Sequence, residues 1–176
     1  MKRLICAIAI LLTVASLVSC AAEIPDVPEG MIEVSNDKVD YHLYVPDDWT
    51  AETSTGVITA KYSDSIMVNV SMMAATLPEE TTDVQSYWAG YTESFGSAIE
   101  DFELIKENEA VLLDGHEAGR YVYKGTVAGS VEAQYQQIIC IKDGVVYIFT
   151  YTAAPDKYEE YLGDVEDMLE NFKFKD

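Results

Sequence analysis

Alternating apolar and polar residues predict four strands in the first half of the chain. The segment 31–34 is a plausible first strand, and residues 41–45 alternate until Pro46, which cannot donate a hydrogen bond to a sheet. The segments 57–62 and 66–73 predict two further strands, joined by a tight turn. We therefore expect a sheet to begin soon after residue 30.

The apolar spacing changes to three and four residues between positions 84 and 95, which indicates a helix. Thr82 and Gln85 stand at the spacing of a capping box at its start. The apolar face of this helix consists of Val84, Tyr87, Trp88, Tyr91 and Phe95. Such an aromatic stripe can bind a ligand, but covering a sheet is its commoner use, and we interpret it as core.

From Phe102 onward the pattern predicts an antiparallel meander. Asp114-Gly115 and Asp143-Gly144 are hairpin signals, because a type I′ turn needs positive φ at both central residues. Ala128-Gly129 is a third, weaker turn. The segments 138–141 and 145–149 are apolar on both faces, so we expect their hairpin in mid-sheet with both sides covered.

A final helix is predicted to open near Pro155, because proline is tolerated in the first turn of a helix. Its opposite face is strongly acidic, so the helix needs packing to be stable. Its apolar stripe consists of Tyr158, Tyr161, Leu162, Val165, Met168, Leu169 and Phe172.

Residues 1–19 predict a lipoprotein signal peptide. Two basic residues precede an uncharged segment, residues 4–18, that is shorter than the ~20 residues of a membrane-spanning helix. Leu17-Val18-Ser19-Cys20 then resembles a lipobox, so we expect cleavage before Cys20 and lipid attachment to it. The alternatives are an uncleaved anchor, or a secretory cleavage site near an incidental cysteine.

The sequence after Cys20 divides into a tether and one domain. Residues 20–30 contain two prolines and no apolar periodicity, which predicts a short extended tether. Residues 31–176 have the length of a single globular domain.

The charge balance limits the partners. The chain has 31 acidic and 11 basic residues and a net charge of −20, which becomes −22 once the two basic residues of the signal are removed. This argues against nucleic acid, and against adhesion of the domain to anionic lipid. We expect contact with the membrane through the lipid on Cys20, an envelope protein or a basic ligand as partner, and a monomer.

The remaining candidates for chemistry favour structural roles. Cys140 lies among isoleucines, which indicates a small core residue rather than a catalytic thiol. His42 and His116 belong to no triad or zinc motif, so we interpret each as a surface or packing residue. The acidic clusters at Asp47-Asp48 and Glu79-Glu80 form no calcium loop. We expect no cofactor, no metal ligand and no catalytic residue.

Several segments together resemble a known family. Tyr41-x-Leu43-x-Val45-Pro46-x-x-Trp49, the middle helix, the meander, and the end of the chain from Thr150-Tyr151-Thr152-Ala153 onward are similar to bacterial lipoproteins with a PsbP-like domain. The resemblance covers residues 31–176. It implies an α+β fold, an antiparallel sheet meander covered by helices in an α/β/α sandwich. It transfers no metal or binding residue, because a fold does not define a function.

The sequence therefore predicts a non-catalytic binding or scaffolding module, lipid-anchored at the extracytoplasmic face of a cell membrane. One alternative is a lipoprotein that binds a divalent metal or a small ligand. Another is a hydrolase, which would need His42 or His116 beside an acid and a hydroxyl group.

Overall fold

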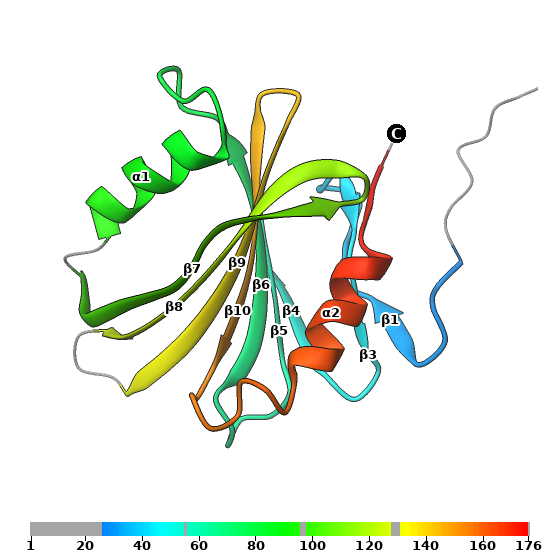
Figure 1. The fold of residues 1–176 in the computed structure, drawn as a ribbon. Coiled ribbons are helices and arrows are strands. Elements are labelled where there is room, and N and C mark those ends of the chain that lie inside the picture. Colours follow the sequence, from blue (N-terminus) through cyan, green and yellow to red (C-terminus); the bar gives the residue numbers. More distant parts are fainter. Residues whose placement is uncertain (1–25, 55, 96–97, 128–130, 176) are drawn as a thin grey trace, which may run out of the picture.

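The computed structural model describes residues 26–54, 56–95, 98–127 and 131–175 (Figure 1). These residues form eleven strands and two helices. The elements are β1 (Met31–Glu33), β2 (Tyr41–His42), β3 (Tyr44–Pro46), β4 (Thr50–Ser54), β5 (Val57–Lys61), β6 (Val68–Thr76), α1 (Val84–Phe95), β7 (Ile99–Leu113), β8 (His116–Val127), β9 (Glu132–Lys142), β10 (Val145–Ala153), α2 (Leu162–Asn171) and β11 (Lys173–Phe174).

Seven strands form one antiparallel sheet in the order β4-β5-β6-β10-β9-β8-β7. Helix α1 covers one face, and α2 covers the other (Figure 1). This confirms the predicted α+β fold. The turns Asp114-Gly115 and Asp143-Gly144 have positive φ at both residues, as predicted. The predicted turn at Ala128-Gly129 lies outside the described residues.

The hairpin of β9 and β10 occupies the middle of the sheet, as its apolar pattern predicts. Ile138 and Phe149 pack on the α2 side, and Ile139 and Ile148 pack on the α1 side. All four side chains are at most 3% exposed. Both faces are covered here, which explains why neither strand needs a polar side.

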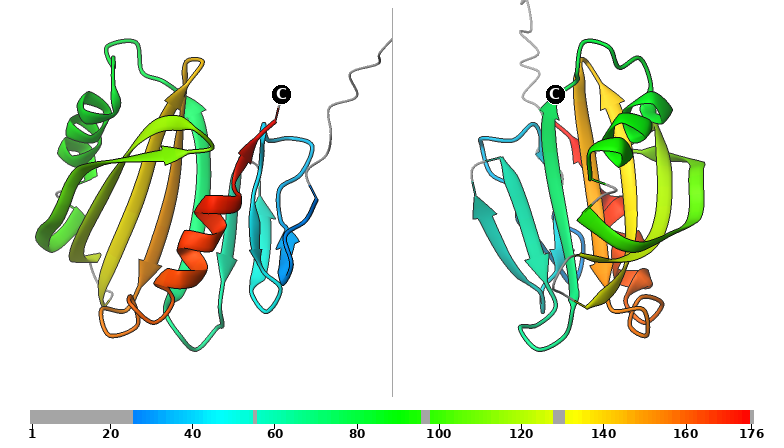
Figure 2. Two further views of the ribbon diagram at one scale, coloured as in Figure 1. Left: turned by 45° about the vertical axis from the view of Figure 1, so that its right-hand side comes forward. Right: turned by 90° about the vertical axis from the view of Figure 1, so that its left-hand side faces the viewer.

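The larger core lies on the α2 side, where Val165 and Met168 of the helix are fully buried. The short strand pairs β1–β3 and β2–β11 contribute to the same core (Figure 2). The predicted strand 41–45 is thus two strands with different partners, because β2 pairs with β11 and β3 with β1.

The predicted start of the last helix near Pro155 is wrong, because α2 begins at Leu162. Residues before it form turns, in which Lys157 N–H donates to the Ala154 carbonyl at 2.8 Å. The Tyr151 hydroxyl donates to the Tyr158 carbonyl at 2.9 Å, and this carbonyl would otherwise accept a bond from Leu162 in a continuous helix. The Tyr151 hydroxyl of β10 therefore occupies the Tyr158 carbonyl where the turns end, and α2 begins only at Leu162.

Candidate binding surface

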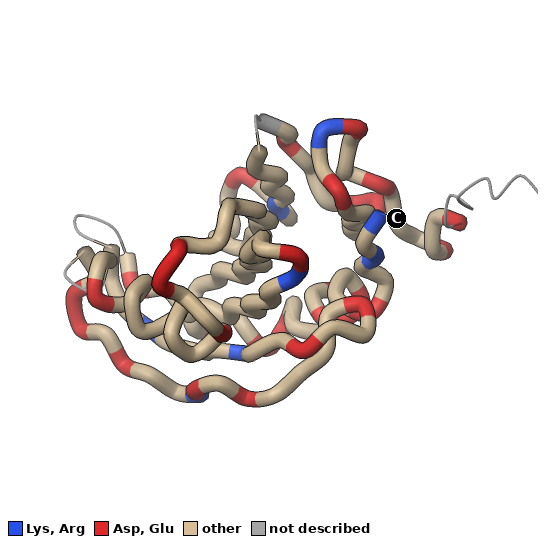
Figure 3. The backbone as a smooth tube through the Cα atoms, turned by 90° about the horizontal axis from the view of Figure 1, so that it is seen from above, with Lys and Arg blue, Asp and Glu red and all other residues tan. Residues whose placement is uncertain are grey.

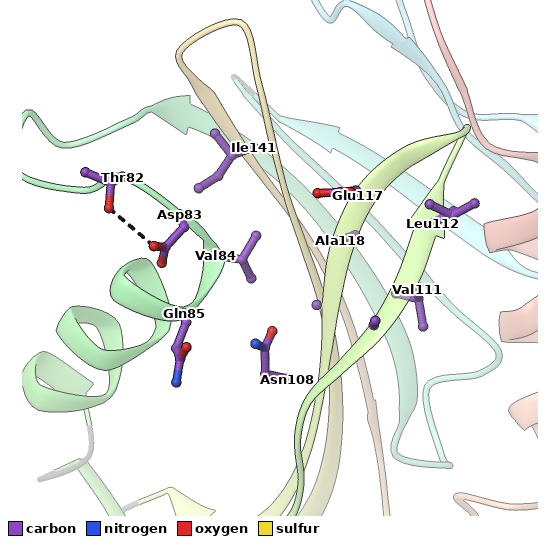
Figure 4. Close-up of a pocket in the computed structure, with 12 residues that line it drawn as sticks. Thr82, Asp83, Val84, Gln85, Asn108, Val111, Leu112, Glu117, Ala118 and Ile141 are labelled. Atoms are coloured by element: carbon purple, nitrogen blue, oxygen red, sulfur yellow. Dashed lines mark hydrogen bonds between the residues drawn. The ribbon is translucent and has the colours of Figure 1, made fainter.

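An open groove of about 800 Å³ runs beside the N-terminal end of α1 (Figure 4). We call it the α1 groove. The helix end faces β7 and β8 across it. Its lining residues are Thr82, Asp83, Val84, Gln85, Asn108, Ala110, Val111, Leu112, Glu117, Ala118, Gly119 and Ile141. A groove of this size can accept a peptide segment or a small molecule.

The floor of the groove depends on a close approach at Gly119. A Cβ atom there would lie 2.6 Å from Asn108 Oδ1 and 2.8 Å from Val84 Cγ1. Asn108 has a φ of 46°, and it lies in a register shift of β7 between Lys106 and Glu109. The glycine therefore lets an irregular edge strand and the first turn of α1 meet over the sheet.

The start of α1 is capped one residue later than predicted. Ser86 N–H donates to Asp83 Oδ1 at 2.7 Å, and Asp83 N–H donates to Ser86 Oγ at 3.1 Å. These reciprocal bonds make Asp83 the cap in place of Thr82, and Ser86 takes the position predicted for Gln85. The hydrogen bonds from the backbone and side chain of Ser86 lower the pKa of Asp83. A fixed carboxylate thus stands at one end of the groove.

Strand β7 forms an edge of the sheet and exposes four large apolar side chains, of which Leu112 lines the groove. The most exposed is Leu112, at 67%. Between residues 99 and 113 the strand also carries five acidic residues and one lysine. We call this the β7 surface, and its apolar residues are Phe102, Leu104, Ile105 and Leu112. Charges and bulges protect an edge strand from uncontrolled pairing, but they also make it selective.

The three candidates for chemistry, Cys140, His42 and His116, lie in different surroundings. Cys140 is fully buried in the α2-side core, and burial raises the pKa of its thiol to about 11. His42 Nδ1 lies 2.8 Å from Glu33 Oε1, and the ring of His116 meets that of Phe174 edge-on. Cys140 and His116 thus have the predicted packing roles. Glu33 Oε1 also accepts a hydrogen bond from Ser35 Oγ at 2.6 Å, so the acid stands between His42 and the hydroxyl group, whereas a nucleophile needs the base beside it. Neither histidine lines the α1 groove.

The described residues were also compared with the requirements of a metal site and of a membrane-spanning helix. Within the described ranges, no group of three His, Cys, Asp or Glu side chains is arranged to hold a metal ion. The same ranges contain no helix that is long and apolar enough to cross a membrane. Cys20, the one site residue predicted from the sequence, lies outside the described residues, as do residues 1–19.

The architecture defines a class of fold. A seven-stranded antiparallel sheet with a helix on each face is the PsbP-like α+β fold. The solution structure of the cyanobacterial PsbP protein CyanoP from Synechocystis sp. PCC 6803 is similar, with a TM-score of 0.60 and 19% identity. The match covers 90% of this chain and 98% of CyanoP.

Two further solved structures share the fold. LpqN, involved in cell envelope biogenesis of Mycobacterium tuberculosis, has a TM-score of 0.54 and 13% identity, over 83% of this chain and 90% of LpqN. The Ran-binding protein Mog1p of Saccharomyces cerevisiae has a TM-score of 0.58 and 8% identity, over 83% and 96%. No protein-family model matches this sequence, and no curated protein matches it. At such identities the likeness shows the fold.

Sequence reasoning missed both the α1 groove and the β7 surface. The acidic and apolar residues of β7 follow no clean period of two, because the strand shifts register three times against β8. Gly119 was the available signal, since a glycine inside a strand often marks a close backbone approach. The signal does not say which residue makes the approach.

Proposed function

We propose that this chain is an exported lipoprotein, anchored through Cys20 at the outer face of a membrane, whose domain binds a basic envelope protein without catalysis. The observation that carries the proposal is the β7 surface, where four large apolar side chains are exposed on an edge strand and one of them, Leu112, lines an open groove. A monomer has little reason to expose such residues on one edge unless they contact a partner.

The charge of the chain selects the chemistry of the partner. Acidic positions far outnumber basic ones along the described part of the backbone (Figure 3). On β7 the ratio is five acids to one lysine. A segment with apolar residues flanked by Lys or Arg would complement both features, and long-range attraction would speed its approach.

Proteins of the same fold support a binding role. Mog1p is a Ran-binding protein, and LpqN takes part in cell envelope biogenesis. Binding a protein and working in the envelope are therefore both compatible with this architecture. The location at the outer face of a membrane is proposed from the lipobox at Cys20.

Photocrosslinking in the native membrane tests the docking surface. A crosslinking amino acid at Leu112 should form one discrete adduct, which weakens at high ionic strength and after Glu107→Lys with Glu109→Lys. Thr53 is the matched control, because it is exposed on β4 at the opposite edge of the sheet. Equal adducts from both positions, or an adduct to an acidic segment, would overturn the proposal.

The anchor has a separate test. Cys20→Ser should abolish acyl labelling and either release the domain from membranes or leave an unprocessed precursor. Acyl labelling that persists in the variant would show that Cys20 is not the lipid site.

A further inference from the structure

A second cavity lies between the C-terminal half of α1 and the sheet, and it shares no lining residue with the α1 groove. Its volume is about 380 Å³, which suits a ligand of one or two rings. Tyr91 and Phe95 of α1 form one wall, and Tyr123 and Tyr135 of the sheet form another. Met73 of β6 closes the far side.

The cavity is uncharged, although the chain as a whole carries a net charge of −20. None of its thirteen described lining residues is acidic or basic. A charged ligand would lose its water here without gaining an ionic partner, so the cavity favours a neutral one. Aromatic walls also favour a ring, which they can stack against or meet edge-on.

One buried polar group of the cavity wall lacks a hydrogen-bond partner on its acceptor side. Gln137 is only 3% exposed, and its Nε2 donates to Thr150 Oγ1 at 3.2 Å and to the Tyr91 hydroxyl at 3.4 Å. Its Oε1 is buried and has no hydrogen-bond partner among the described residues. A buried acceptor without a partner is costly, and a ligand donor would satisfy it once the Gln137 amide turns Oε1 toward the cavity.

We propose that this cavity binds a small, uncharged ring compound that donates a hydrogen bond to Gln137 Oε1. The site is independent of the docking surface on β7. The class of ligand follows from the aromatic walls, the absence of charge among the described lining residues, and the buried acceptor that lacks a partner.

Two adjacent methionines provide the readout. Met73 lines the cavity, whereas Met72 points to the opposite face of β6 and is fully buried in the α2-side core. The full chain, labelled with ¹³C at the methionine methyl groups in phosphatidylcholine nanodiscs, is titrated with indole. The methyl signal of Met73 should shift and saturate, while that of Met72 stays in place.

Two analogues test the chemistry of the ligand. Benzothiophene keeps the shape of indole but lacks the N–H group, so it should bind about three- to ten-fold more weakly. Indole-3-acetate carries a negative charge and should not bind. Gln137→Leu should weaken indole by the same factor and leave benzothiophene unchanged.

A filled cavity gives a second, independent variant. Ser71→Phe should place a ring in the cavity and abolish the Met73 shift. Asn69→Phe is the matched control, two residues away on the same face of β6 and outside the cavity lining. The Met72 signal shows whether each variant is folded. No saturable Met73 shift, equal shifts of both methionines, or equal affinities for indole and benzothiophene would each overturn the proposal.

Discussion

The two faces of the sheet hold their helices in different ways. Helix α2 buries Val165 and Met168 completely in the larger core. Helix α1 buries one residue, Trp88, whose ring stacks on Tyr121 with 4.1 Å between centroids. Open space lies at both ends of α1, as the groove and as the second cavity. The α2 face is built for stability, and the α1 face leaves room for ligands.

Polar contacts repeat this contrast. Glu166 of α2 accepts a bond from Arg120 Nη2 at 2.9 Å and one from Gln136 Nε2 at 3.3 Å. The Tyr158 hydroxyl continues the network to Gln136 Oε1 at 3.2 Å. On the α1 face, Gln137 is bonded only through its nitrogen. A network with several shared partners orients α2 over the sheet.

Truncating one apolar residue of each helix, fully buried in α2 and half-buried in α1, should give the largest difference between the faces. Met168→Ala removes a fully buried side chain and should lower the free energy of unfolding by about 2–5 kcal/mol. Val84→Ala at the half-buried start of α1 should cost about 1 kcal/mol or less. Urea unfolding of both variants measures the two values. Equal costs would mean that α1 is packed as tightly as α2.

Removing the Glu166 carboxylate, which bonds α2 to the sheet, should have the next largest effect. Glu166→Ala removes the nearer of the two carboxylates beside the Arg120 guanidinium and the acceptor of Gln136 Nε2. It should cost about 1–2 kcal/mol, because both charges of the ion pair are partly exposed. Asp167→Ala changes an exposed neighbour on the same helix and should stay within about 0.5 kcal/mol. If the two variants were equally stable, the network would contribute nothing to the attachment of α2.

Alkaline pH should weaken both faces through buried tyrosines. Burial, followed by the charge of Asp40, raises the pKa of Tyr41 to about 12, and burial, followed by Glu107 and Asp83, raises that of Tyr121 to about 12. Both hydroxyl groups are buried without a partner.

The sign of the effect follows from which state loses its proton first. An unfolded tyrosine has a pKa of about 10, so it ionises before the folded one as the pH rises. The contribution of these tyrosines to the free energy of unfolding is therefore fully present below about pH 10, and it is lost as the pH rises toward 12. Tyr41→Phe and Tyr121→Phe should each flatten this fall, whereas Tyr62→Phe leaves both buried hydroxyls in place and should not. Unfolding curves that fall with an unchanged slope in Tyr121→Phe would contradict the assignment.

Local signals in the sequence predicted the hairpins and α1, because turn chemistry and helical spacing act within a few residues. Long-range contacts account for the errors. The Tyr151 hydroxyl delays α2, and β4 escaped prediction because its polar residues follow no apolar alternation at the sheet edge. The groove depends on Asn108 meeting Gly119 across two strands, which no local pattern encodes. Lipid attachment at Cys20 was predicted from the lipobox, a motif of the unprocessed precursor, and it stays a prediction.

The smallest expected effect is a difference in local opening free energy between α1 and the core, measured in the native protein. Because α1 buries only Trp88 completely and its other apolar residues partly, we expect it to open without unfolding the sheet, whereas Cys140 becomes accessible only on global unfolding. Amide exchange in α1 should then report an opening free energy at least about 1 kcal/mol below that from thiol labelling of Cys140. Ligand bound in the second cavity should raise the α1 value first, since Tyr91 and Phe95 line that cavity. If α1 exchange and Cys140 labelling gave the same free energy, the helix would belong to the cooperative core, and the two faces would differ in shape but not in stability.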